Sequence, residues 1–88
     1  MLKNKDLKAV VLALPAANGT SGNENEAALL AKSMLEEYMP AHIDVLGSVC
    51  GDTGGDGVHI LLDAHIDRIG MTVTAVDDSG FIKFARVG

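Results

Sequence analysis

The most telling stretch of the sequence, residues 61–70, reads LLDAHIDRIG, an apolar run that ends in His-x-Asp and a glycine. An apolar run of this length predicts a buried strand, and the two-residue repeat of a strand places His65 and Asp67 on the same side of it. Burying two titratable side chains costs free energy unless a partner compensates them. Two interpretations follow. Either the two side chains hydrogen-bond to each other at the strand end, or His65 binds a metal ion and Asp67 orients its ring.

The residues that precede this stretch predict two helices. Apolar side chains recur every three or four residues over 7–14, which indicates an amphipathic helix, and Pro15 is expected to end it. A second helix is expected over 25–39, with the side chain of Ser21 or Asn23 as its N-terminal cap.

From residue 42 onward the pattern changes to that of strands. Five segments rich in apolar and β-branched residues are expected to be strands: 42–45, 48–50, 58–64, 71–76 and 81–87. The first two are bent at Gly47, the glycine-rich residues 51–57 form a hairpin loop, and 58–64 is the central strand. Residues 77–80, DDSG, are a good turn sequence between the last two. The order predicts an α/β chain of the α+β kind, with two N-terminal helices followed by a mixed β-sheet.

Length and composition limit the possible functions. Eighty-eight residues make at most one small domain. Hydrophobic residues make up 48% of the chain and aromatic residues only 3%, which predicts an aliphatic core. The net charge of −5 argues against a nucleic-acid partner, whose phosphates need a basic surface. The apolar stretches are far shorter than the ~20 residues that span a bilayer, so no membrane partner is expected. The single cysteine, Cys50, cannot form an internal disulfide, and no signal-peptide pattern precedes residue 7. We therefore expect a cytoplasmic protein.

Further motifs connect the His-x-Asp stretch to a known family. Residues 18–24, NGTSGNE, resemble the N-terminal G-x-S-G-x-E of the co-catalytic dimetal aminopeptidases. That family includes the glutamyl and the deblocking (tetrahedral) aminopeptidases, and its members are often labelled cellulase or endoglucanase. Residues 64–70, AHIDRIG, are similar to the family's A-H-M-D-E-I-G. The turn at 77–81 and the final Val-Gly follow in the family's order, so the resemblance extends over residues 7–88.

The resemblance implies a fold and a function. It implies that residues 1–88 are the N-terminal part of a larger, zinc-peptidase-like catalytic domain and end near the junction with the family's second domain. The activity implied is that of a metal-dependent aminopeptidase, which hydrolyses N-terminal residues from peptide substrates and forms a homo-oligomer. In such a site His65 would bind one of two divalent metal ions (Zn²⁺, Co²⁺ or Mn²⁺), and Asp67, also at the catalytic site, would hydrogen-bond its ring.

The chain supplies only part of such a site. Two metal ions need about five ligands and a general base, and the resemblance places the others downstream of His65. His59 has the same strand parity, but six residues along a strand is ~20 Å, too far to share the metal. The 88 residues alone are therefore expected to be inactive and to hold no metal stably. Arg68 stands where the family usually has Glu, which reverses a charge beside the site.

Two other functions stay open. The chain could be a free-standing binding or scaffold module without catalysis. It could also be a glycoside hydrolase, as the cellulase label would suggest, but that reaction needs two catalytic carboxylates that flank a sugar ring. A histidine at a strand end fits metal-dependent hydrolysis better.

Overall fold

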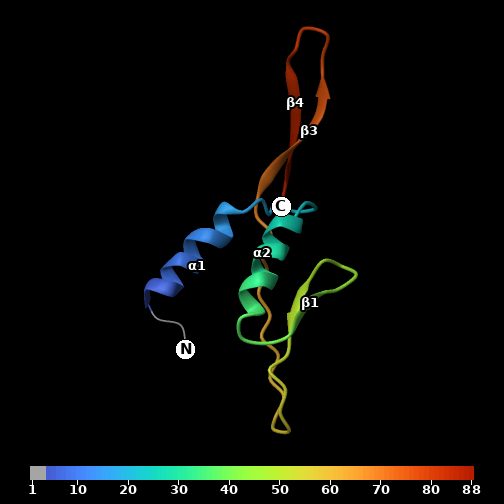
Figure 1. Cartoon of the computed structure of the whole chain (residues 1–88). Coiled ribbons are helices and arrows are strands. Elements are labelled where there is room, and N and C mark those ends of the chain that lie inside the picture. Colours follow the sequence, from blue (N-terminus) through green and yellow to red (C-terminus); the bar gives the residue numbers. More distant parts are fainter. Residues whose placement is uncertain (1–3) are drawn as a thin grey trace.

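The computed structural model describes residues 4–88. Its elements are two helices followed by four short strands: α1 Asn4–Ala16, α2 Asn25–Leu35, β1 Ala41–Ile43, β2 Val49–Gly51, β3 Gly70–Val76 and β4 Ile82–Val87 (Figure 1). The predicted α+β order of helices and then strands is confirmed. The strands form two separate antiparallel pairs, β1–β2 and β3–β4, where one mixed sheet was expected. None of the described helices is long and apolar enough to cross a bilayer.

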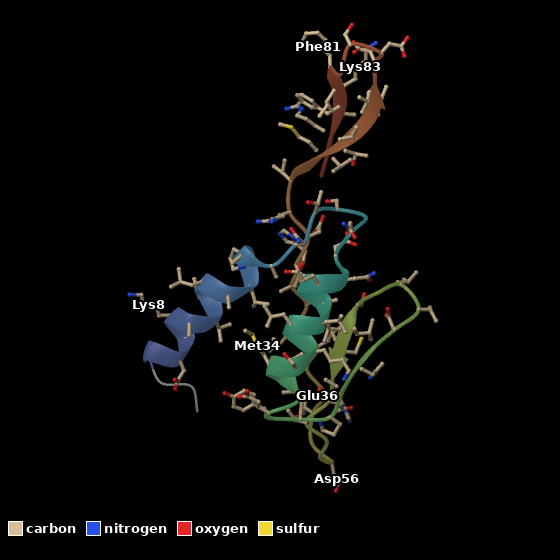
Figure 2. The ribbon with its side chains drawn as sticks, turned by 45° about the horizontal axis from the view of Figure 1, so that its top comes forward. Lys8, Met34, Glu36, Asp56, Phe81 and Lys83 are labelled. Atoms are coloured by element: carbon tan, nitrogen blue, oxygen red, sulfur yellow. The ribbon has the colours of Figure 1, made fainter. Side chains whose placement is uncertain are left out.

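The molecule is elongated, with extents of 62 × 31 × 16 Å. The β3–β4 hairpin projects beyond the helices at one end, where Phe81 and Lys83 lie, and the loop around Asp56 extends at the other end (Figure 2). The buried apolar side chains among the described residues are three alanines, Ala17, Ala27 and Ala28. Small side chains allow the chain after α1 to lie directly against the start of α2, and the buried apolar side chains are found at this junction.

The first helix runs one residue past its predicted stop. Because Pro15 lies in the last turn of α1, its missing N–H removes one hydrogen bond without preventing the turn, and Ala17 N donates to Ala13 O and Leu14 O at 3.2 and 3.3 Å.

The second helix begins at the predicted residue but ends earlier, at Leu35, and is followed by turns. Its N-cap residue is Glu24, which makes no side-chain capping bond, so the predicted caps Ser21 and Asn23 are wrong. The Ser21 hydroxyl has a different partner, described below.

The β1–β2 hairpin follows α2 and packs against it. Asp44 closes its turn, since its Oδ1 accepts hydrogen bonds from Leu46 N and Ser48 N, both at 2.9 Å. Gly47 has a φ of +89°, a conformation that side chains rarely adopt. Two short strands around Gly47 were predicted, and the hairpin confirms them.

The predicted central strand over residues 58–64 is wrong. These residues have no regular structure, and Val58, Ile60, Leu61 and Leu62 are 81–92% exposed. The apolar pattern indicates a preference for burial, but a strand also needs a neighbour for its backbone N–H and C=O groups, and none of the described strands pairs with it. Residues 51–57 therefore do not form the predicted hairpin loop, because only one of the two segments that they join is a strand.

The β3–β4 hairpin was predicted and is confirmed. Its register pairs Val73 with Phe84 and Val76 with Ile82, and a bulge lies between Val73 and Ala75. The extra residue brings Val73 and Val76 onto the same face, together with Phe84 and Ile82. Along with Met71, these side chains form an apolar face whose members are 58–64% exposed.

Candidate functional site

The two motifs that carry the family resemblance lie side by side in the structure. Thr20 and Arg68 form an isolated parallel bridge. Ser21 N donates to Arg68 O at 3.1 Å, and Arg68 N donates to Gly19 O at 2.7 Å. The loop over residues 18–24 therefore crosses residues 65–70 close to the start of α2 (Figure 1). Both motifs are recognisable in the sequence, but the contact between them was not predicted.

Gly70 permits this close approach. A Cβ atom at Gly70 would lie 2.4 Å from Thr20 Cγ2 and 2.8 Å from Thr20 Oγ1, closer than real side chains pack. The glycine that ends the AHIDRIG stretch is thus required by the contact with the earlier motif.

The Arg68 side chain reaches the end of α1. Its Nη1 donates to Pro15 O at 2.7 Å, at the C-terminal end of α1. A guanidinium suits the negative end of the helix dipole, and the bond satisfies a carbonyl that the last turn leaves unpaired. This contact gives Arg68 a structural role in this chain.

A chain of hydrogen bonds links Ser21, Asp67 and His65. His65 Nδ1 lies 3.0 Å from Asp67 Oδ1 and 3.2 Å from the Asp67 carbonyl oxygen. Ser21 Oγ donates to the other carboxylate oxygen, Asp67 Oδ2, at 2.6 Å. The predicted contact between His65 and Asp67 is present although the strand that was expected to carry it is absent. Ser21 was predicted only as a possible helix cap, so its contact with Asp67 was missed; its place inside the motif at residues 18–24 was the available signal.

The hydrogen bonds define which nitrogen of His65 is free. A carboxylate only accepts hydrogen bonds, so in the neutral imidazole the proton is assigned to Nδ1, facing Asp67, and the lone pair to Nε2. The His65 side chain is 86% exposed, which leaves that lone pair open to solvent. A histidine backed by a carboxylate in this way is the usual arrangement of a metal ligand.

The same three residue types form the nucleophilic triad of serine hydrolases, but the order of contacts here is different. A nucleophilic serine gives its proton to the histidine, whereas Ser21 donates to Asp67, which lies between Ser21 and His65. Ser21 is therefore not placed to act as a nucleophile through His65.

Asp67 is an ionised group at neutral pH. The hydrogen bond from Ser21 and, next, the one from His65 lower the pKa of the Asp67 carboxyl below its ordinary value of 3.8, because both bonds favour the charged form.

An open pocket of about 310 Å³ lies beside His65, between the β1–β2 turn and residues 63–67. Its polar lining side chains are those of Glu24, Ser48, Asp63, His65 and Asp67. Within residues 4–88, no three His, Cys, Asp or Glu side chains gather closely enough to hold a metal ion. The residues present fit one histidine ligand with its orienting carboxylate, and the described part of the chain does not complete a metal site.

Comparison with known proteins identifies the family. Residues 47–88 match the sequence profile described as M42 glutamyl aminopeptidase. A protein of Acetivibrio thermocellus named "Putative aminopeptidase" is 38% identical over 74 residues, which are 80% of this chain and 22% of that protein. "Putative aminopeptidase FrvX" of Escherichia coli K12 is 33% identical over 73 residues, which are 82% of this chain and 20% of that protein.

A third relative has a different name. "Putative [LysW]-lysine/[LysW]-ornithine hydrolase" of Pyrococcus abyssi is 46% identical over 50 residues, which are 56% of this chain and 15% of that protein. The chain spans about a fifth of the length of the first two relatives. No solved structure is significantly similar to it. The matched profile and the relatives agree: the chain belongs to the M42 glutamyl aminopeptidase family, a family of peptidases.

Proposed function

We propose that the chain contributes a metal ligand, His65, to a metal-dependent aminopeptidase. The observation that carries the proposal is the state of the His65 ring: Nδ1 is held by the Asp67 carboxylate at 3.0 Å, and Nε2 faces solvent beside an open pocket. Membership of a peptidase family and the aminopeptidase names of two relatives support the reaction class.

Each residue of the site would have a separate role. His65 Nε2 would hold one divalent ion, and Asp67 would keep the ring in the tautomer that can bind it. When bound, a pair of ions such as Zn²⁺, Co²⁺ or Mn²⁺ would supply an activated water and polarise the carbonyl of the scissile peptide. Because one imidazole cannot hold such a pair, we expect the 88-residue chain alone to release no N-terminal residues.

Peptide hydrolysis is favoured over glycoside hydrolysis by the contacts of Asp67. A glycosidase needs one carboxyl that donates a proton and a second that attacks the sugar or activates water. Both oxygens of Asp67 are already occupied, one by Ser21 and the other by His65, and its lowered pKa keeps it ionised. It is therefore unsuited to be the proton donor.

A chimera distinguishes the proposed catalytic role from the alternative that the chain is a scaffold module without catalysis. The 74 matched residues of this chain replace their counterparts in the Acetivibrio thermocellus relative, which supplies the remainder of the protein. The unmodified relative must first hydrolyse an amino-acid p-nitroanilide. We then expect the chimera to do so as well, and a chelator to stop it. A folded chimera that is inactive, beside an active parent, would contradict the proposal.

A further inference from the structure

The hydrogen bonds around Asp67 extend beyond the His-x-Asp pair to a residue of the earlier loop. We infer that Ser21 is a positioning residue, which fixes the orientation and tautomer of His65 by holding the Asp67 carboxylate. The importance of this orientation rests on the proposed function of His65 as a metal ligand.

Packing cannot orient the His65 ring, since its side chain is 86% exposed. In the described part of the chain, the hydrogen bonds of the ring both go to Asp67, one to Oδ1 and one to the backbone oxygen. The direction of the ring therefore depends on the direction of the Asp67 carboxylate. That side chain is itself 41% exposed, so burial does not fix it either.

Ser21 supplies the missing constraint. A carboxylate that accepts a bond through Oδ1 alone can rotate about its Cβ–Cγ bond, whereas bonds to both oxygens define its plane. The Ser21 bond to Oδ2 is the shorter of the two side-chain bonds, 2.6 Å against 3.0 Å, and it is assisted by the carboxylate's charge.

The Ser21 hydroxyl is in turn fixed by the backbone. Its own N–H donates to Arg68 O, and Arg68 N donates to Gly19 O, so the two peptide units that precede the Ser21 side chain are held. Asn23 N closes a turn on Thr20 O at 2.7 Å directly after it. The contact between the two motifs thereby places a hydroxyl next to a carboxylate that lies far away in the sequence.

The ring tautomer of His65 provides the test. Nitrogen-15 NMR of the whole 88-residue chain, with chelator present and at a pH where the imidazole is neutral, measures the ratio of the Nδ1–H to the Nε2–H form. We expect the Nδ1–H form to dominate. Ser21→Ala should lower this ratio about threefold to tenfold, since the carboxylate loses one of its two hydrogen bonds.

Two further variants separate the hydroxyl from a general disturbance. Ser33→Ala removes a serine hydroxyl that donates to Leu30 O on α2, and it should leave the ratio unchanged. Ser21→Thr keeps a hydroxyl at the site and should preserve the ratio of the original chain. An unchanged ratio in Ser21→Ala, or an equal fall in Ser21→Thr, would overturn the inference. The measurement needs no bound metal and no activity, so its outcome is independent of the chimera experiment.

Discussion

At the scale of single residues, Asp67 determines the state of its neighbours. Its carboxylate keeps the proton of His65 on Nδ1 and accepts the Ser21 hydroxyl through the other oxygen. Both hydrogen bonds therefore depend on the negative charge of Asp67 as well as on its position. An uncharged side chain of the same shape would bind both partners more weakly.

The titration of Asp67 should reflect these bonds. The pKa of Asp67 is lower in the folded chain than its ordinary value of 3.8. The hydrogen bonds to the carboxylate therefore stabilise the fold at pH values above 3.8, and this stabilisation is lost as the pH falls through the folded pKa. Carbon-13 NMR of the carboxyl should give a midpoint below 3.8. Ser21→Ala should raise that midpoint, because it removes the largest cause of the shift. A midpoint at or above 3.8 in the original chain would contradict the hydrogen bonds described.

The pair of His65 and Asp67 could be predicted from the sequence because the relation is local. Residues two apart in an extended chain point to the same side, whether or not the chain joins a sheet. Ser21 could not be predicted in the same way. Its contact with Asp67 depends on how the loop after α1 crosses a segment far along the chain, and the spacing of residues does not encode that crossing.

At the scale of elements, the crossing of residues 18–24 and 65–70 depends on Gly70. Gly70→Ala would push a methyl group into Thr20, and overpacking of this kind costs about 1–3 kcal/mol. We expect hydrogen exchange to show lost protection at the amides of Ser21 and Arg68. Gly57→Ala is the matched control, since a Cβ there meets nothing within 4 Å. Equal exchange in the two variants would show that the crossing does not need the glycine.

The β3–β4 hairpin depends on its turn. Asp77 Oδ1 accepts hydrogen bonds from Ser79 N and Phe81 N, both at 2.9 Å. Asp77→Ala should therefore destabilise the hairpin by about 0.5–1.5 kcal/mol per lost bond, at the lower end because the turn is exposed. Amide exchange along β3 and β4 measures the effect. Asp78→Ala is the control, because it also removes one negative charge, one residue further along the chain. Its exchange rates should match those of the original chain. Similar acceleration of exchange in both variants would contradict the role of Asp77.

The confirmed strands of the β3–β4 hairpin and the wrong strand prediction at residues 58–64 have the same physical explanation. The β3–β4 hairpin carries its own turn sequence, so each of its strands has the other as a partner and the sequence predicts both. Residues 58–64 have an equally apolar pattern but no adjacent turn that brings a partner to them. Apolar pattern alone therefore predicts which residues favour burial, and pairing decides whether they become a strand.

At the scale of the whole molecule, the described residues expose more apolar surface than monomeric proteins usually do. The apolar face of β3–β4 and the residues 58–62 are both open to solvent, and the hairpin has two unpaired edges. We propose that the chain forms homo-oligomers through these surfaces, because open edges and apolar faces recruit further strands.

Light scattering at micromolar concentration tests this association. We expect a mass above that of one 9.2 kDa chain. Phe84→Thr removes the largest side chain of the apolar face and should weaken association, whereas Lys83→Thr, on the opposite face of β4, should not. A stable monomer with folded chemical shifts would show that the 88 residues need no further cover.

The measurement that bears most directly on His65 is the metal content of the chimera with and without the His65 imidazole. His65→Ala should remove about one metal ion per chain and most of the aminopeptidase activity, since a direct ligand is lost. His59→Ala removes a histidine that does not line the pocket, and it should leave both unchanged. Elemental analysis and kinetics on the two variants provide the comparison. Full metal content and full activity in His65→Ala would contradict the assignment of His65 as a ligand.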